Sequence, residues 1–389
     1  MTATMHCPVC GGGDTAVLVS LESVPVFCNV LHDTVDSARS AARAPFELRY
    51  CHTCTHAFNG AFDPALVEYS GAYENALHFS PTFREYADRL AQRLVADNDL
   101  HGQTVAEIGC GDGSFLEQLC SLGVRKGIGF DPSRPAEVVG PVTYVNDYFS
   151  EKYASISPDF VCCRHVLEHI AEPRDFVQSV GRTVRDRPRP GVYFEVPNSL
   201  YTLRDLGIWD LIYEHCSYFS PVSLRVLFEA TGYRVVRLAE EYGGQFLGLD
   251  AVVEQARPSS EKAGPEETSA LEGLARAFGA AHAETVSRWT DRLRQMADEQ
   301  RRTVVWGAGS KAVTFLNVAD SADCVREVVD VNPRKHGKFV SGSGQRIVSP
   351  ADMEPGSVDV VLLMNPLYQE EVSAMLAERG VRCAIEVVK

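Results

Sequence analysis

The segment VAEIGCGDGSFLEQL, residues 105–119, predicts a strand that runs through a glycine-rich turn into a helix. Its three glycines permit a tight turn and a close approach of the backbone to a ligand. Their spacing is GxGxG, which differs from the GxGxxG of dinucleotide-binding folds. Glu107 lies just before the turn, and Asp131 follows the next predicted strand. A carboxylate at that second position can accept hydrogen bonds from both hydroxyls of a ribose.

Strands and helices alternate from residue 104 to about residue 255. This alternation is typical of an α/β fold, a mostly parallel sheet with helices on both faces. A polar, helix-prone stretch at 257–302 follows, and a second alternating unit begins with RTVVWGAGSKAVTFLN at 302–317. The strands predicted in the first unit are 104–108, 126–130, 159–163, 191–196, 233–239 and 247–253.

The composition favours a globular protein of the cytoplasm. Hydrophobic residues make up 45% of the 389 residues, enough for two or three domains. The sequence shows no apolar run near the ~20 residues that cross a bilayer and no signal-peptide pattern at its start. The formal net charge of −15 argues against nucleic acid or an anionic membrane as the main partner. The 12 cysteines lack a disulfide-scaffold spacing and therefore favour a reducing compartment.

Two CxxC pairs, CPVC at 7–10 and CHTC at 51–54, predict a zinc site near the N-terminus. Each pair can bring two thiolates onto one Zn²⁺, and two pairs complete a tetrahedral shell. Such a shell leaves no open position, so the metal is predicted to be structural. The ligands would be Cys7, Cys10, Cys51 and Cys54. The alternative is two unrelated thiol pairs without metal.

Around the first glycine turn the chain resembles the class I methyltransferases that use S-adenosylmethionine (SAM). The resemblance implies that Gly109 and Gly111 lie beside the amino-acid end of SAM and that Asp131 binds its ribose. NDYF (146–149) and CRHVLEHI (163–170) stand where that class contacts adenine and borders the methyl-donor site. The implied cofactor site comprises Tyr73, Glu107, Gly109, Gly111, Asp131, Pro132, Asp147, Tyr148, Phe149, Arg164 and His165. A generic Rossmann-like turn, shared by many nucleotide-binding folds, is the alternative.

Seven segments of the chain follow one another in an order that carries a wider resemblance. They are CPVC…CHTC, YSGAYENALHFSPTF, EIGCGDG, EHCSYFSPVSL, GAGSKAVTFLN, DVNPRKHGK and NPLYQEEV. In this order, over nearly its whole length, the chain is similar to the three-domain SAM-dependent sugar C-methyltransferases. The resemblance implies a zinc-binding domain at 1–68, a SAM-binding methyltransferase domain at 69–256 and a Rossmann-like domain at 257–389. Because the outer domains could cover the pocket, we expect a monomer.

The resemblance also implies a nucleotide-linked deoxysugar as substrate, held in part by the C-terminal domain. The second glycine turn, VVWGAGSKAVTFLN at 304–317, could place backbone N–H groups at a phosphate. Residues near the ends of the neighbouring predicted strands are the candidate substrate contacts. They are Lys311, Asp330, Lys335, Asn365 and Tyr368. The alternative is a degenerate Rossmann unit kept for packing, with the lysines as surface charges.

The segment GIWDLIYEHCSYFSPVSL at 207–224 concentrates the candidate catalytic groups. A carbon next to a ketone, such as carbon 3 of a 4-keto sugar, becomes a nucleophile when a base removes its proton. His215 is the predicted base, because a neutral imidazole is available near pH 7. Glu214 would orient that imidazole or bind a sugar hydroxyl, while Tyr213 or Tyr73 would hydrogen-bond the enolate oxygen. His165 is favoured over His169 as a site residue.

One departure from the family leaves the acceptor atom open. The family pattern here is Tyr-His-Glu-His, whereas residues 212–215 read Ile-Tyr-Glu-His. Methylation of an amine or a hydroxyl of a related acceptor is therefore an alternative to C-methylation. A non-catalytic SAM- or nucleotide-binding protein and an NAD-dependent dehydrogenase are further alternatives. The intact GxGxG turn and the Glu-His pair argue against the non-catalytic reading.

Overall fold

The computed structural model describes residues 5–67, 73–184, 191–254, 264–320 and 324–389, and within them the strands form three sheets. The N-terminal sheet has the order β1-β2-β3-β10. Its strands are β1 (Thr15–Pro25), β2 (Arg43–Cys51), β3 (Ala57–Asn59) and β10 (Ser217–Tyr218). Because β10 belongs to the 207–224 segment, the N-terminal sheet holds one end of the loop that carries Glu214 and His215.

The central sheet has eight strands in the order β11-β12-β9-β8-β4-β5-β7-β6. The five strands from β9 to β7 pair in parallel, β12 runs antiparallel to β9, and β11 and β12 form a hairpin. The strands are β4 (Thr104–Ile108), β5 (Lys126–Phe130), β6 (Glu137–Val139), β7 (Val142–Val145), β8 (Phe160–Arg164), β9 (Gly191–Pro197), β11 (Tyr233–Glu241) and β12 (Phe246–Val253). The predicted α/β class is confirmed, and β6 and β7 are the strands that the predicted set lacked.

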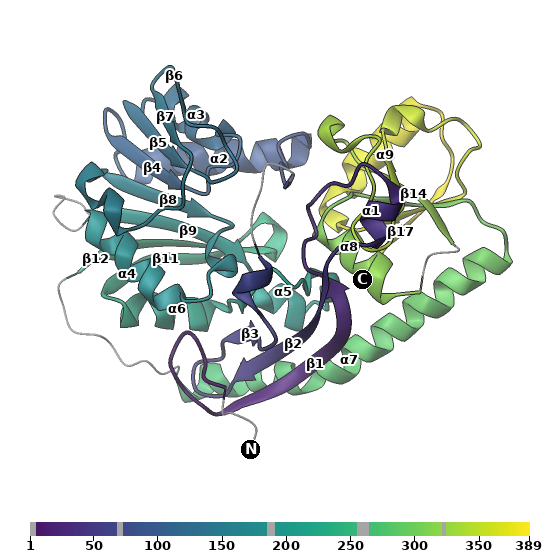
Figure 1. Cartoon of the computed structure of the whole chain (residues 1–389), viewed down its shortest axis with the longest axis horizontal. Coiled ribbons are helices and arrows are strands. Elements are labelled where there is room, and N and C mark those ends of the chain that lie inside the picture. The colour runs from purple at the N-terminus through teal and green to yellow at the C-terminus, as the bar shows by residue number, and fades with distance from the viewer. Residues whose placement is uncertain (1–4, 68–72, 185–190, 255–263, 321–323) are drawn as a thin grey trace.

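Helices cover both faces of the central sheet (Figure 1). The apolar residues of α2 (Pro81–Asp97) and α3 (Ser114–Ser121) pack on one face, and those of α4 (Pro173–Val184) and α6 (Pro221–Ala230) pack on the other. The short α5 (Ser199–Leu203) follows β9. This arrangement leaves the carboxyl ends of the parallel strands free for a ligand.

The C-terminal sheet is parallel throughout, in the order β15-β14-β13-β16-β17. Its strands are β13 (Thr303–Trp306), β14 (Val325–Val329), β15 (Arg346–Val348), β16 (Val360–Leu363) and β17 (Ala384–Val387), with helices α8 (Ser310–Val318) and α9 (Gln369–Glu378). The helix α7 (Pro265–Asp298), ~51 Å long at 1.5 Å per residue, runs past the N-terminal sheet towards this unit (Figure 1).

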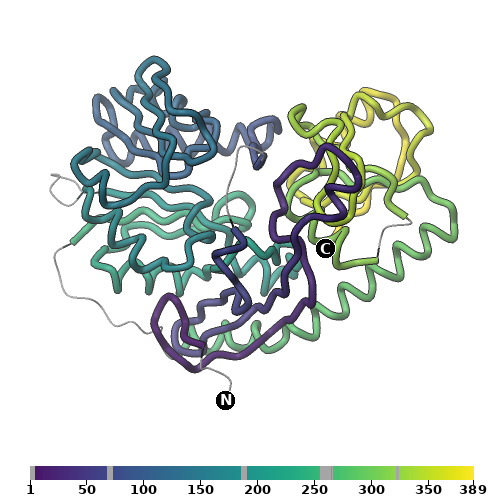
Figure 2. The backbone as a smooth tube through the Cα atoms, viewed as in Figure 1, coloured from purple at the N-terminus to yellow at the C-terminus, as the bar shows by residue number. Residues whose placement is uncertain are grey.

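A segment of the N-terminal region crosses to the C-terminal sheet (Figure 2). It contains α1 (Val35–Arg39), and His32 forms a backbone bridge to Phe339. The His32 Nε2 atom also lies 3.0 Å from the Ser341 hydroxyl. Just before α1, Val30 forms a bridge to Tyr73. One short segment therefore touches both the C-terminal unit and the start of the central unit.

The predicted domain boundaries at 68/69 and 256/257 fall on residues outside the described ranges and stay predictions. So does the first part of the segment YSGAYENALHFSPTF, whose residues 69–72 are not described. Among the described residues, no helix is both long enough and apolar enough to span a membrane.

Candidate active site

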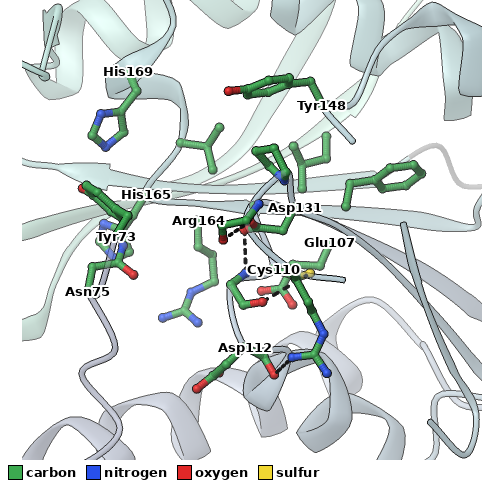
Figure 3. A pocket seen from close by; sticks show the side chains of 18 of the residues that line it. Tyr73, Asn75, Glu107, Cys110, Asp112, Asp131, Tyr148, Arg164, His165 and His169 are labelled. Carbon is green, nitrogen blue, oxygen red and sulfur yellow. Dashed lines mark hydrogen bonds between the residues drawn. The ribbon is translucent and has the colours of Figure 1, made fainter. Parts of the chain in front are cut away.

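A pocket of about 810 Å³ opens at the carboxyl ends of β4, β5 and β8 (Figure 3). The chain order of the strands reverses between β4 and β8, and such a switch point is where open α/β sheets bind ligands. All eleven residues predicted to bind the cofactor line this pocket. They are Tyr73, Glu107, Gly109, Gly111, Asp131, Pro132, Asp147, Tyr148, Phe149, Arg164 and His165.

The glycine turn is shaped by backbone conformations that favour glycine. Gly109 has a φ of +70°, and a Cβ atom there would lie 2.2 Å from Cγ2 of Val166. The amide of Gly111 donates to the carboxylate of Asp131 over 2.8 Å. The other oxygen of that carboxylate accepts from the amide of Ser133, also over 2.8 Å. The turn therefore fixes Asp131 in the pocket wall, where a ribose hydroxyl could reach it.

Glu107 is the clearest sign that the pocket accepts a cationic group. Its side chain is buried, and its Oε2 atom has no hydrogen-bond partner among the described residues. Burial raises the pKa of Glu107 to about 8, although Arg164 opposes the shift. An unpaired buried carboxyl is costly unless a ligand satisfies it. The α-ammonium group of SAM would do so.

We expect Glu107→Gln to stabilise the free protein and to weaken SAM. A carboxyl whose pKa is raised on folding stabilises the fold fully only below its unfolded pKa, and this stability is lost as pH rises through about 8. Between pH 5 and pH 9 the melting temperature of the variant should therefore fall less than that of the wild-type protein. Losing a charged hydrogen bond should weaken SAM about 10- to 100-fold by calorimetry. Equal SAM affinity, compared with the exposed control Glu85→Gln, would contradict the assignment.

A buried ionic network supports the floor of the pocket. Glu195 on β9 is fully buried and lies 3.0 Å from Arg164 and 3.0 Å from His165. Burial would raise the pKa of Glu195, but these two cations hold it far below its ordinary value. Burial opposes the charge on His165, yet Glu168 and Glu195 raise its pKa to about 9. His165 is therefore a cation at neutral pH, held with a left-handed φ of +55°.

The structure brings His215 beside the pocket rather than into its lining. Its ring packs edge-on against His169, with the ring centroids 4.8 Å apart. His169 does line the pocket, so it stands closer to a bound ligand than the sequence predicted. Its Nδ1 atom donates to the carbonyl oxygen of Glu214 over 3.1 Å, which leaves Nε2 as an acceptor in the neutral ring.

His215 is uncharged at neutral pH. Burial lowers its pKa well below the ordinary value, and the nearby His169, His165 and Lys311 lower it further. The neutral imidazole can act as a base, but the lowered pKa makes it a weaker proton acceptor than a free imidazole. As a base, His215 therefore needs a nearby group that stabilises its protonated form.

The position of Tyr213 corrects one prediction. Its side chain is fully buried, and its hydroxyl accepts from the amide of Asp63 over 2.8 Å. The phenol thus anchors the loop to the N-terminal unit and does not reach the pocket. Glu214 is buried as well and accepts from the amide of Cys28 over 3.0 Å, which orients it towards the same unit.

Tyr73 is the predicted phenol that does line the pocket. Its hydroxyl accepts from the side-chain amide of Asn29 over 3.3 Å. In Figure 3 Tyr73 lies with His165 and His169 at one end of the pocket, while Tyr148 lies at the other.

The four predicted metal ligands lie together. The sulfur atoms of Cys7 and Cys54 are 3.6 Å apart, as are those of Cys10 and Cys51, and none of the four is in a disulfide. Thiolates about 2.3 Å from a tetrahedral Zn²⁺ lie ~3.8 Å from each other. All four Sγ atoms fall within 4.8 Å of one another, so the cluster fits a zinc ion.

Two of the five predicted substrate contacts make hydrogen bonds to the backbone of the C-terminal unit. Asp330 is buried and accepts from the amides of Ala308 and Asn332 over 2.7 and 2.8 Å. Lys335 is also buried, and its ammonium donates to the carbonyl of Ala308 over 2.9 Å. These side chains brace the second glycine turn from within. Asp330 makes the same pair of backbone bonds as Asp131, so these contacts leave the predicted substrate role of Asp330 and Lys335 a prediction.

The other three predicted contacts lie where the C-terminal unit meets the central unit. The ammonium of Lys311 lies 3.0 Å from Asp210 and 3.1 Å from the side-chain oxygen of Gln245. The side chain of Asn365 exchanges two hydrogen bonds with the same Gln245. Tyr368 accepts a hydrogen bond from the hydroxyl of Tyr242 over 2.7 Å. All three remain partly exposed at this junction.

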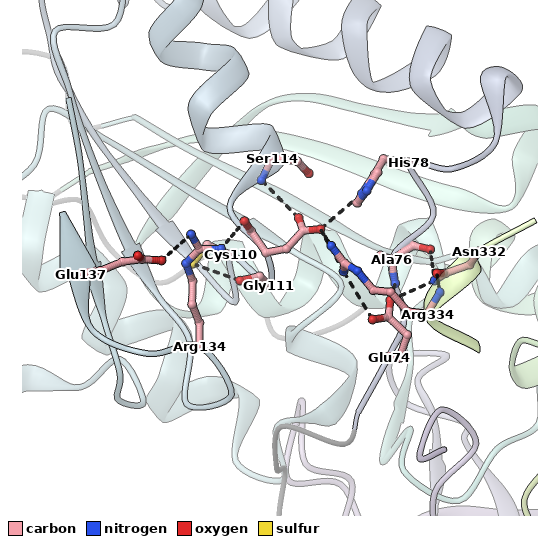
Figure 4. Close-up of polar contacts among 11 residues, drawn as sticks. Glu74, Ala76, His78, Cys110, Gly111, Ser114, Arg134, Glu137, Asn332 and Arg334 are labelled. Carbon is pink, nitrogen blue, oxygen red and sulfur yellow. Dashed lines mark hydrogen bonds and ion pairs between the residues drawn. The ribbon is translucent and has the colours of Figure 1, made fainter. Parts of the chain in front are cut away.

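The C-terminal unit also supplies one residue to the cofactor pocket, Arg334. Its guanidinium lies 3.3 Å from the carboxylate of Glu74 and 3.3 Å from that of Asp112 in the glycine turn (Figure 4). Asn332 donates to Glu74 over 3.0 Å, and His78 lies 3.5 Å from Asp112. These contacts form an interdomain clamp over the glycine turn, which no local sequence pattern had indicated.

Removing the clamp should change cofactor exchange more than stability. Arg334 is about half exposed, at 47%, so each of its ion pairs contributes only ~0–1 kcal/mol. We expect Arg334→Ala to raise the dissociation rate of SAM about three- to tenfold, measured by stopped-flow fluorescence, with a nearly unchanged melting temperature. The exposed Arg326→Ala serves as the matched control. An unchanged dissociation rate would mean that the clamp does not close the pocket.

Comparison with known proteins agrees with this geometry. Residues 79–238 match the family model of a methyltransferase domain, and residues 251–387 match that of a C-methyltransferase C-terminal domain. The C-methyltransferase NovU of Streptomyces niveus is 28% identical over 392 residues, which span 94% of this chain and 91% of that protein. A ubiquinone biosynthesis O-methyltransferase of Proteus mirabilis is 31% identical over 132 residues, covering 31% of this chain and 52% of that protein.

Among solved structures, the magnesium protoporphyrin IX methyltransferase of Synechocystis with bound SAH aligns with a TM-score of 0.34 and 20% identity, covering 44% of this chain and 84% of that chain. The two family models and the relative that spans nearly the full chain support a C-methyltransferase family. The protein is a SAM-dependent methyltransferase.

Proposed function

We propose that the protein C-methylates a nucleotide-linked 4-keto deoxysugar at the carbon next to the ketone, in the biosynthesis of a natural-product sugar. The observation that carries the proposal is the His169–His215 ring pair beside the end of the pocket that Tyr73 and His165 also line, where we place the acceptor. A carbon acceptor needs such a base, because its C–H bond must be broken before it can attack a methyl group. The C-methyltransferase relatives support the same class of acceptor atom.

In the proposed reaction SAM supplies an electrophilic methyl group on a sulfonium. His215 removes the proton from the acceptor carbon, and the electron pair is delocalised onto the neighbouring ketone oxygen. Tyr73 donates a hydrogen bond to that oxygen, since this residue lines the same end of the pocket. His169 fixes the base through the edge-on ring contact. The pocket holds the two reactants together, which contributes much of the rate.

We propose that the C-terminal unit binds the nucleotide part of the acceptor at the junction that contains Lys311, Asn365 and Tyr368. Lys311 carries a positive charge that suits a diphosphate. We further propose that the cysteine cluster binds a structural Zn²⁺ through Cys7, Cys10, Cys51 and Cys54. Both roles remain separate from the proton transfer, so each can be tested without an active acceptor.

The acceptor test uses SAM with a ¹³C-labelled methyl group and two thymidine-diphosphate 6-deoxysugars, one with a 4-ketone and one with a 4-hydroxyl. We expect label only in the ketone, with the methyl signal coupled to a sugar carbon in the NMR spectrum. Turnover of the 4-hydroxyl sugar, with the methyl on oxygen, would instead favour the alternative of O-methylation. Label on the nitrogen of an amino sugar would favour N-methylation in the same way.

A further inference from the structure

A buried carboxyl group, that of Glu168, lies among three histidines next to the pocket. The side chain of Glu168 is 2% exposed, and its Oε1 atom lies 3.7 Å from Nδ1 of His165. Its Oε2 atom is fully buried and has no hydrogen-bond partner among the residues that the structure describes. A buried carboxyl oxygen normally has a hydrogen-bond partner, so the unpaired Oε2 atom needs an explanation.

Two further histidines lie close to the carboxyl group of Glu168. One oxygen of Glu168 and one ring nitrogen each of His169 and His215 lie within 4.8 Å of one another. His169 lines the pocket, and His215 packs edge-on against it. The carboxylate therefore faces the two imidazoles that would receive a proton from an acceptor.

The position of Glu168 follows from the local backbone. It lies in the short 3-10 helix Leu167–His169, which begins two residues after the left-handed residue His165. The carbonyl oxygen of Glu168 accepts from the thiol of Cys216 over 3.3 Å. This bond fixes the backbone of Glu168 independently of any bond made by its side chain.

We propose that Glu168 is a positioning residue that stabilises the protonated form of the His169–His215 pair during catalysis. In this step the acceptor C–H bond breaks, its electron pair stays on the acceptor, and an N–H bond forms on an imidazole. The resulting imidazolium pairs with the carboxylate of Glu168. After methyl transfer the proton leaves to solvent. The inference rests on the proposed function, because only a carbon acceptor requires this proton to be taken first.

Several other charges act on the His169–His215 pair and limit how far Glu168 can raise the pKa of an imidazole. His165 is a cation beside Glu195, Lys311 approaches from the C-terminal unit, and both disfavour a proton on His215. One carboxyl oxygen of Glu168 lies within 4.8 Å of a ring nitrogen of each member of the pair, so we expect its negative charge to oppose these cations. An opposite charge at this range shifts the pKa of a titrating group by about 1–3 units.

The test needs no acceptor, so it is independent of the proposed substrate. The protein is saturated with S-adenosylhomocysteine, and the pKa values of its imidazoles are measured by NMR titration. The variants His169→Asn and His215→Asn assign the resonances of the two rings. We expect Glu168→Gln to lower the pKa of one imidazole of the pair by about 1–2 units, and Glu168→Asp to restore part of it. The exposed Glu172→Gln is the matched control and should change nothing. Unchanged titration in Glu168→Gln would overturn the proposal.

A metal assay separates the competing explanation that these three side chains hold a cation. A metal ion beyond the one bound by the cysteine cluster, lost in Glu168→Gln but kept in Glu172→Gln, would overturn the positioning role. If an acceptor turns over, kcat should fall about 10- to 100-fold in Glu168→Gln while the Kd for SAM stays within twofold. An unchanged kcat would likewise count against Glu168, whereas absence of turnover in every variant would count only against the substrate.

Discussion

His215→Asn is expected to lower kcat on the order of 10²- to 10⁴-fold while leaving the affinity for SAM nearly unchanged. The amide keeps a polar side chain of similar shape, but it cannot take a proton from the acceptor. His215 does not belong to the lining of the cofactor pocket, so SAM should bind as before. Single-turnover kinetics with labelled SAM and calorimetry of SAM binding provide the two measurements.

The opposite pattern is expected for Asp131→Ala, which makes it the matched comparison. Asp131 lines the pocket and is fixed there by the amides of Gly111 and Ser133. Its removal should weaken SAM and leave a measurable rate at saturating cofactor. If His215→Asn weakened SAM as strongly as Asp131→Ala does, the assignment of His215 as the base would be wrong.

Cys51→Ser is expected to cause the second large effect, loss of bound zinc together with loss of a stable N-terminal sheet. Structural zinc supplies apparent free energies of about 10–16 kcal/mol in zinc-finger peptides, comparable to the whole stability of a domain. The damage should spread to activity, because β3 of that sheet pairs with β10 beside the His215 loop. Metal analysis and the melting temperature give the readouts.

Cys383→Ser controls for the loss of a thiol elsewhere, since this half-buried cysteine lies outside the cluster. It should keep the metal and the melting temperature. A Cys51→Ser protein that retains stoichiometric zinc, or a wild-type protein that binds none, would contradict a four-cysteine zinc site.

The sequence predicted the elements whose pattern is local. Buried apolar runs such as Thr104–Ile108 and Lys126–Phe130 were predicted with their observed bounds, because burial on both faces leaves little ambiguity. The glycine turn and Asp131 were likewise predicted, since positive φ angles restrict the choice of residue. The strand β6 was missed because it has only three residues, too few for a periodic pattern, and its two valines are exposed.

The parts of the site that depend on contacts between distant segments could not be predicted from the sequence. Arg334 reaches Asp112 across 222 positions of sequence, and no spacing rule connects the two. The phenol of Tyr213 turns towards Asp63, 150 positions away, although its sequence neighbours suggested an active-site role. The role of Glu195 in the site was not predicted, because a glutamate in a strand is common. The one sequence signal for it was that this acid stands alone within the apolar run GVYFEVP.

The central claim is that the protein removes a proton from a carbon next to a ketone. The most direct test incubates the protein with a thymidine-diphosphate 4-keto-6-deoxysugar in deuterated water. S-adenosylhomocysteine replaces SAM, so that the enolate can only be reprotonated. We predict that mass spectrometry will find deuterium at carbon 3, at a rate that falls to the enzyme-free level in His215→Asn. Methyl transfer to this sugar with SAM, without any exchange at carbon 3, would contradict the account.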